Sequence, residues 1–148
     1  KQMGKMEETL WDRLSKAGSR AEREVPFATY FQRSDVIAEL ALVNGQLVGF
    51  AFRSAELERV DRRKVKMFLY ELHVGKCEPP LKGIGRRLVQ ACVQSLKAKV
   101  VHLNVHKDQA LLPPGENAIG FYERLGFVRT QDVNESASLM EHHDAGTI

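Results

Sequence analysis

The stretch "ELHVGKCEPPLKGIGRRLVQAC", residues 71–92, decides how the chain is interpreted. It begins as an apolar strand, breaks at two prolines, passes Gly83-Ile84-Gly85 and continues as an amphipathic helix. Such a junction has two interpretations. It is either a tight turn that packs well, or a site where the bare N–H groups at a helix N-terminus hold an anion such as phosphate.

The residue types around the turn are compatible with an anion, although a lone G-x-G turn also fits the packing interpretation. Gly83 and Gly85 have no Cβ to keep a ligand away from the backbone, and Lys82, Arg86 and Arg87 add positive charge. The turn lacks the Lys-Ser/Thr of a nucleotide P-loop and the third glycine of a dinucleotide fingerprint. It therefore does not favour a kinase or a dehydrogenase.

The flanking segments predict a mixed α/β sheet covered by helices. Asn44-Gly45 separates "VIAELALV" from "LVGFAFRS" and predicts a hairpin with a type I′ turn. "MFLYELHV" has few charges and predicts a central strand buried on both faces, whereas "AELERVDRRKVK" before it predicts a solvated loop or an exposed strand end. Three helices are expected from spacing and capping, at residues 7–24, 84–97 and 116–126. Strands are expected at 100–105 and from 127, followed by a polar tail, 142–148, that we expect to be disordered.

The composition limits the function. A chain of 148 residues, 43% hydrophobic and 28% charged, fits one domain over residues 1–148, although the missing initial Met is compatible with a piece of a longer protein. No apolar run reaches the roughly 20 residues of a membrane span. Two cysteines and five scattered histidines predict neither a disulfide framework nor a metal site. A net charge of +3 suits anionic small ligands and is too mild for a dedicated nucleic-acid binder.

Five motifs occur together: "LVGFAF", "FLYELHV", "GIGRRLVQ", "LNV" and "AIGFYERLGF". Over residues 36–130 the chain resembles the GNAT superfamily of acetyl-CoA-dependent N-acetyltransferases. The resemblance implies an α/β (α+β) fold with a central mixed, mostly antiparallel sheet that is splayed at the cofactor site and flanked by helices. It also implies acetyl-CoA as the cofactor and direct attack by an amine in a ternary complex.

The resemblance also implies a set of cofactor contacts. Backbone groups near the end of the central strand should pair with the pantetheine arm, and the N–H groups of the glycine turn should hold the pyrophosphate. The implied residues are Leu72, His73, Val74, Lys82, Gly83, Ile84, Gly85, Arg86, Arg87, Asn117 and Tyr122. The first position of the family's glycine pattern is Pro80 here, so one contact should be missing or come from Lys76, Lys82 or Arg86.

Acetyl transfer to an amine needs a base and a donor to the leaving thiolate. Glu71 is the candidate base, and His73 shares its side-chain parity and could share the role. The alternative makes Glu71 an ion-paired partner of Arg53. By the resemblance Tyr122 is the general acid and the backbone N–H of Val74, or of a neighbour, is the oxyanion donor. The alternative for Tyr122 is a core tyrosine.

Within the superfamily, "FLYELHV" is similar to the Tyr-x-Tyr-Glu-Leu strand of the NatD-type histone N-terminal acetyltransferases. The similarity places Tyr70 and Glu71 at the acceptor amine, Trp11 near the cleft, and Glu56 and Glu58 against a basic peptide. Two substrate-side positions depart from that pattern, namely Phe68 in place of the first tyrosine and Asn104 in place of threonine.

The predicted acceptor is therefore the α-amine of a protein or peptide N-terminus, such as a histone tail. A lysine side chain or a small-molecule amine remains an alternative acceptor, and a non-catalytic acyl-CoA-binding module is an alternative function. We expect no metal, no direct contact with nucleic acid and no membrane association. We also expect a monomer or homodimer in the cytoplasm, the nucleus or both.

Overall fold

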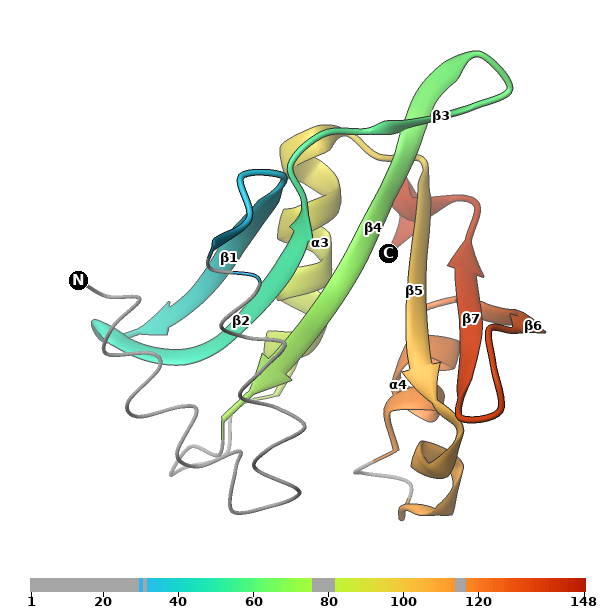
Figure 1. The fold of residues 1–148 in the computed structure, drawn as a ribbon. Coiled ribbons are helices and arrows are strands. Elements are labelled where there is room, and N and C mark those ends of the chain that lie inside the picture. Colours follow the sequence, from blue (N-terminus) through green and yellow to red (C-terminus); the bar gives the residue numbers. More distant parts are fainter. Residues whose placement is uncertain (1–29, 31, 76–81, 114–116) are drawn as a thin grey trace.

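A computed structural model describes residues 30, 32–75, 82–113 and 117–148. They form one seven-stranded sheet in the order β1-β2-β4-β5-β7-β6, with β3 paired to β4 (Figure 1). Every pairing is antiparallel except β4 with β5. The strands are β1 Val36–Val43, β2 Gln46–Ser54, β3 Glu58–Val60, β4 Arg63–Val74, β5 Val100–His106, β6 Val128–Asp132 and β7 Ala137–His142. This confirms the predicted mixed, mostly antiparallel sheet.

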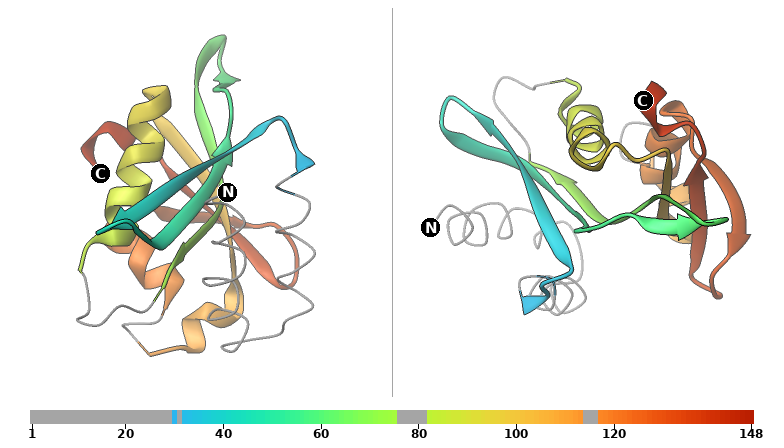
Figure 2. Two further views of the ribbon diagram at one scale, coloured as in Figure 1. Left: turned by 90° about the vertical axis from the view of Figure 1, so that its left-hand side faces the viewer. Right: turned by 90° about the horizontal axis from the view of Figure 1, so that it is seen from above.

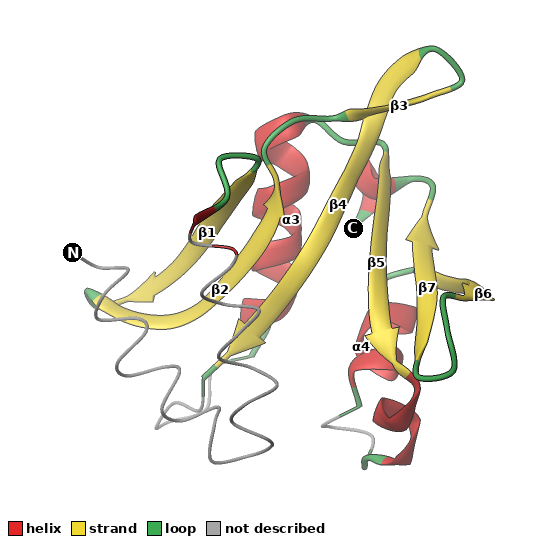
Figure 3. Cartoon of the chain, in the orientation of Figure 1, coloured by secondary structure: helices red, strands yellow, loops and turns green. Residues whose placement is uncertain are grey.

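Helices α3 (Ile84–Leu96) and α4 (Ala118–Arg124) flank the sheet (Figure 3). Two short 3-10 helices, η1 (Lys107–Leu111) and η2 (Ala145–Thr147), follow β5 and β7. The main core lies between α3, α4 and one face of the sheet. From α3 it takes the apolar stripe that the sequence predicted, Ile84, Leu88, Val89, Cys92 and Val93. Among the described residues no helix is long and apolar enough to span a bilayer.

Local signals placed several boundaries well. Asn44 and Gly45 both have positive φ, 51° and 76°, so the β1–β2 hairpin turns where the sequence predicted. Gly126 follows α4 with φ 102°, as expected of a helix end. Helix α4 begins two residues later than predicted, because the side chain of Asn117 caps it by accepting the N–H of Gly120 at 3.1 Å. The helix predicted at 7–24 lies outside the described residues.

Three predictions need correction, and the first concerns the segment before the central strand. Part of "AELERVDRRKVK" forms β3 and the start of β4, joined by a tight turn in which Asp61 and Arg62 have φ of 49° and 72°. The sequence did not reveal this second hairpin because neither turn residue is a glycine. The prediction of an exposed strand end holds, and that of a loop does not.

The second correction concerns the burial of β4. Met67 and Leu69 are buried, but the residues from Tyr70 to His73 are only half-buried and Val74 is 38% exposed. The strand is central, yet Met67 and Leu69 are its only buried residues, and Arg63 and Lys64 at its start are exposed. Its second half therefore has a solvent-facing side on which polar groups can act.

The third correction concerns the predicted polar tail. His142 ends β7 and is buried, with Asp144 N–H donating to its Nδ1 and its Nε2 3.0 Å from the carbonyl oxygen of Leu125. Since Nδ1 accepts, Nε2 must carry the proton and donate. Ala145 is also buried. The tail is ordered because it packs against α3 and α4, which is a non-local effect that polar composition hides.

A buried ion pair joins β1, β2 and α3 at the edge of the core. The Arg53 guanidinium, 6% exposed, contacts Glu39 Oε1 at 2.9 Å, and the hydroxyl of Ser95 donates to the same oxygen. Removing one member of such a pair leaves the other charge buried without compensation, which costs roughly 3–5 kcal/mol for a fully buried pair.

We therefore expect Glu39→Ala to lower the free energy of unfolding by about 2–3 kcal/mol, less than the full value because Glu39 is partly exposed. Urea denaturation measures the change. Lys107→Ala is the matched control, because it breaks the exposed Lys107–Asp132 pair and should cost less than about 1 kcal/mol. Equal losses in the two variants would show that the Arg53 charge is not isolated from solvent.

Candidate active site

Strands β4 and β5 separate partway along their length. Their parallel pairing ends at Leu69 and Leu103, although β4 continues to Val74 and β5 to His106 (Figure 1). Beyond Leu69, the edge of β4 that faces β5 therefore pairs with no strand in the described part of the chain. An edge that no described strand covers can take an extended ligand as an additional strand.

A β-bulge lies at the same point. Phe52 of β2 pairs with Glu71 and Arg53 pairs with Leu69, so Tyr70 has no partner on β2. Because the extra residue shifts the alternation of side chains, Tyr70 and Glu71 lie on the same side of the sheet. This is the side away from α3, since Tyr70 packs with Phe52 while Leu69 lies in the main core.

The bulge sets the partner of the candidate base. Glu71 Oε1 lies 3.0 Å from His73 Nε2, and the His73 ring is 5.1 Å from that of Phe50. The sequence placed Glu71 and His73 on one face, and they do lie together. The alternative pairing of Glu71 with Arg53 is wrong, because Arg53 lies on the other face with Glu39.

Aromatic rings form a wall beside Glu71. The Tyr70 ring is 4.9 Å from that of Phe68 and 5.5 Å from that of Tyr30, and Tyr30 is 5.2 Å from Phe52. Phe68 thus belongs to this wall. Burial and the nearby carboxylate of Glu71 raise the pKa of Tyr30 to about 12. Tyr30 therefore stays neutral at physiological pH.

Arg33 closes one end of this wall. Its guanidinium carbon lies 4.9 Å from the centre of the Tyr70 ring, and Asp35 holds it through contacts of 2.9 and 2.7 Å. Sequence reasoning missed Tyr30, Arg33 and Asp35. They precede β1, and no local motif shows that this segment crosses the face of β4.

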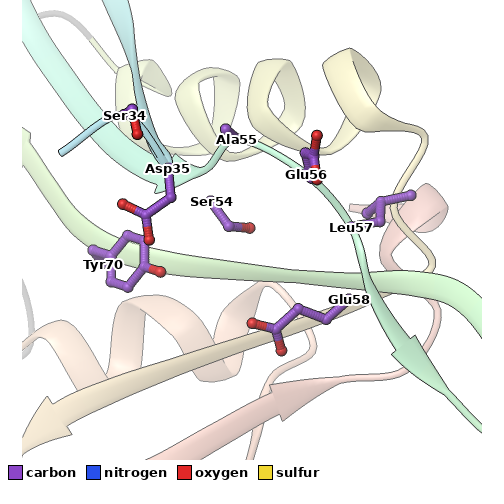
Figure 4. Close-up of a pocket in the computed structure, with 8 residues that line it drawn as sticks. All are labelled: Ser34, Asp35, Ser54, Ala55, Glu56, Leu57, Glu58 and Tyr70. Atoms are coloured by element: carbon purple, nitrogen blue, oxygen red, sulfur yellow. The ribbon is translucent and has the colours of Figure 1, made fainter.

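An open hollow of about 400 Å³ adjoins Tyr70 (Figure 4). Its lining residues are Ser34, Asp35, Ser54, Ala55, Glu56, Leu57, Glu58 and Tyr70. Asp35 pairs with Arg33, and Glu58 contacts Lys66 at 3.2 Å. Glu56 is exposed and has no ion-pair partner among the described residues. The hollow therefore offers one uncompensated carboxylate, which suits a cationic ligand.

The two glycines of the turn have different roles. One matches the open anion site and the other the close packing that the sequence left as alternatives. Gly83 has φ 82°, which glycine adopts without strain, and a Cβ there would meet nothing within 4 Å. A Cβ on Gly85 would lie 2.9 Å from Cζ of Phe121, so Gly85 serves close packing against α4. The first glycine leaves the helix end open, and the second lets α4 approach.

The N-terminus of α3 has the properties of an anion site. No side chain caps it among the described residues, and its first turn contains no acidic residue. The side chains of Lys82, Arg86 and Arg87 are exposed around it. Uncapped N–H groups, the positive end of the helix dipole and three cations together favour an anionic ligand. Lys76 and Pro80 lie outside the described residues.

Tyr122 is buried between Phe121 and Phe127, at ring distances of 5.1 and 5.4 Å. Burial and, next, the charge of Glu71 raise the pKa of Tyr122 well above its ordinary value. Its hydroxyl donates no hydrogen bond to another described residue, yet no fully buried polar side-chain atom there lacks a partner. The Tyr122 ring is a core side chain.

The remaining predicted residues are more dispersed. Leu72 packs against the main core, Val74 lies at the far end of the open edge, and Asn104 is exposed on β5 opposite Leu139. Asn117 uses its side-chain oxygen to cap α4, as described above. Trp11 lies outside the described residues. Within the described ranges no three His, Cys, Asp or Glu side chains are grouped to hold a metal ion.

Comparisons with known proteins give a family and a fold. A family model described as the acetyltransferase (GNAT) family matches residues 4–127. A search of curated protein sequences finds no match. Among solved structures, an aminoglycoside 6′-acetyltransferase type Ii is 21% identical with a TM-score of 0.60, covering 88% of this chain and 83% of that one.

Two further structures have the same fold. The PaiA N-acetyltransferase of Thermoplasma acidophilum, solved in complex with coenzyme A, is 22% identical with a TM-score of 0.55 over 93% of this chain and 79% of that one. The ribosomal-protein-S18-alanine N-acetyltransferase of Escherichia coli is also 22% identical with a TM-score of 0.55, over 80% and 74%. At these identities the likeness establishes the fold and leaves the acceptor open.

The shifted tyrosines predict a pH dependence. A phenol with a higher pKa in the folded chain stabilises the fold fully below its unfolded pKa, near 10, and this stabilisation is lost as the pH rises. We expect the tyrosinate absorbance of the native protein to lag behind that of the urea-unfolded chain between about pH 10 and pH 12. Tyr122→Phe should remove one late-titrating group and make stability fall less steeply above about pH 10. All three tyrosines titrating together near pH 10 in the native protein would contradict the assigned burial.

Proposed function

The chain belongs to the acetyltransferase (GNAT) family, and from this premise we propose that it acetylates the α-amine of a protein or peptide N-terminus that carries positive charge. It is an N-acetyltransferase, and acetyl-CoA is the donor that this family uses. The observation that carries the choice of acceptor is the shared face of Tyr70 and Glu71, which opens onto the hollow at Glu56.

The residues present fit acetyl-CoA. Beyond Leu69 the edge of β4 that faces β5 is covered by no described strand, which suits the extended amide-containing arm of the cofactor. The uncapped N-terminus of α3 and its three exposed cations suit the pyrophosphate. Bound there, acetyl-CoA supplies the acetyl group as a thioester.

The chemistry that remains falls to the side chains near the separation of β4 and β5. An acceptor amine is protonated at neutral pH and must lose a proton before it can attack. Glu71, paired with His73, is placed to take that proton, directly or through the imidazole. The pKa of Tyr122 is raised, so its hydroxyl stays protonated and can donate to the leaving sulfur. We assign the backbone N–H of Val74, or of a neighbour, to the developing oxyanion.

Charge and shape support an N-terminal peptide as the acceptor. The wall formed by Tyr30 and Tyr70 can enclose the small first residues, while Glu56 in the hollow can meet a basic side chain further along. The related fold from E. coli bears a name that gives an alanine of a ribosomal protein as its target. A tail that begins Ser-Gly-Arg, as in histones, matches this arrangement and the NatD-like strand motif.

The first prediction here concerns the cofactor. Arg86→Glu/Arg87→Glu should raise the Kd for coenzyme A by on the order of tenfold or more, because a hydrogen bond to a charged group contributes about 1.5–3 kcal/mol. Isothermal titration calorimetry measures the change. Arg129→Glu, on the remote strand β6, is the control for a single charge reversal and should leave the Kd unchanged. Substitution at Gly85 is a poor test, since a side chain there meets Phe121.

The second prediction concerns the acceptor and the base. Thiol release from acetyl-CoA should occur with a Ser-Gly-Arg peptide and be lost with its N-terminally blocked copy. Glu71→Gln should lower kcat by roughly tenfold to a thousandfold while leaving the Kd for coenzyme A unchanged. Glu135→Gln, an exposed carboxylate in the β6–β7 loop, is the control and should keep full activity.

Each outcome of this experiment decides between functions. Equal activity on free and blocked peptides would make lysine side chains the acceptor. Activity only on small amines would exclude the N-terminal assignment. Coenzyme A binding without turnover of any amine would favour a non-catalytic module, and an unchanged kcat in Glu71→Gln would remove Glu71 from the mechanism.

A further inference from the structure

A two-stranded arm projects from the sheet. It consists of β3 and the first residues of β4, and we call residues 58–66 the basic arm. In Figures 1 and 2 its turn extends beyond the ends of the other strands. The pairs along the arm are Glu58 with Lys66, Arg59 with Lys64 and Val60 with Arg63.

The basic arm concentrates the charge of the protein. Arg59, Arg62, Arg63 and Lys64 are all exposed, and Asp61 is the only acid within residues 59–64. The formal charge of residues 59–64 is +3, equal to the net charge of the whole chain. None of these four cations has an ion-pair partner among the described residues. The mild net charge seen in the sequence therefore hides a strong local concentration.

The arrangement works against the stability of the arm itself. Arg59 and Lys64 lie directly opposite each other, and like charges at opposed positions destabilise a strand pair. At the base of the same arm, by contrast, Glu58 and Lys66 form a favourable opposed pair at 3.2 Å. The tip thus carries repulsion that an anionic partner would relieve.

The residue types at the tip identify the partner's chemistry. Three of the four cations are arginines, whose planar guanidinium matches phosphate with two parallel hydrogen bonds. The arm contributes none of the exposed large apolar side chains of the described residues. A protein interface normally needs an apolar or aromatic centre, and stable anchoring to a membrane needs an inserted apolar group in addition to basic charge.

From these observations we propose that the basic arm binds the phosphate backbone of a double-stranded nucleic acid. A two-stranded β-ribbon fits the width of a duplex groove, and contacts to phosphate need no base recognition. Because the base of the arm lines the hollow and the cations lie at the tip, the nucleic acid would lie beside the acceptor site without filling it.

Fluorescence anisotropy with labelled DNA and RNA duplexes of random sequence tests this proposal. We expect binding at low salt that weakens as salt is raised, with a slope of log Kobs against log salt of about −3 to −4, since each phosphate contact contributes about −0.9. Arg59→Gln/Arg62→Gln/Arg63→Gln/Lys64→Gln should weaken binding by about tenfold or more at low salt and flatten the slope. The two duplexes show whether DNA or RNA is the preferred source of phosphate.

The control variant removes the same charge elsewhere. Lys97→Gln/Lys99→Gln/Arg124→Gln/Arg129→Gln also neutralises four exposed cations and should retain most of the binding. Thermal melting of the arm variant should match wild type and turnover of a short acceptor peptide should be at least as fast, so loss of folding or of acetyl transfer is distinguishable from loss of binding. Equal losses in both variants, or no binding by wild type, would overturn the proposal. Arm-dependent binding to polyglutamate or phosphatidylserine vesicles as tight as to duplexes would also overturn it.

Discussion

The β-bulge at Tyr70 is the constraint on which the candidate active site depends. Without it, side chains would alternate along β4, and Glu71 would follow Leu69 into the core beneath α3. The bulge reverses the alternation, so Leu72 packs into the core while Glu71 and Tyr70 share the open face. A carboxylate in the mostly apolar part of β4, residues 67–74, thereby avoids the free-energy cost of burial and becomes available for chemistry.

The two faces of the sheet have separate tasks as a result. The face toward α3 holds the main core and the buried Arg53–Glu39 pair, and both resist displacement of β2 from the helix. The opposite face carries the aromatic wall and the Glu71–His73 pair. Pairing of β4 with β5 ends where the bulge begins, so the open backbone edge and the candidate base are created at one place. Acetyl-CoA bound along the open edge of β4 and an acceptor amine bound against the aromatic wall would meet there.

The sequence predicted those features that local chemistry determines. Asn44-Gly45 sets its own turn, Gly83 permits its own positive φ, and the spacing of apolar residues marks α3. It did not predict the bulge, the burial of His142 or the approach of Tyr30 and Arg33 to Tyr70, because each depends on a partner far away in the chain. Parity alone joined Glu71 to His73. Only the register with β2 determined which face they share, and this excluded Arg53 as the partner.

The hollow at Glu56 is negatively charged and the tip of the basic arm is positively charged, so the two act in opposite ways on a charged acceptor. A cationic peptide is attracted to Glu56 in the hollow and repelled by Arg62 at the tip of the basic arm. The Glu58–Lys66 pair lies between them and contributes little net field. A duplex bound to the tip would replace that repulsion by attraction, because its phosphates exceed the charge of the arm in number. Basic tails that already lie on nucleic acid would then reach the hollow more readily than the same tails free in solution. The proposed acceptor and the proposed binding of a duplex rest on independent evidence. The charges at the two ends of the β3–β4 hairpin would nevertheless make bound nucleic acid favour binding of a basic acceptor.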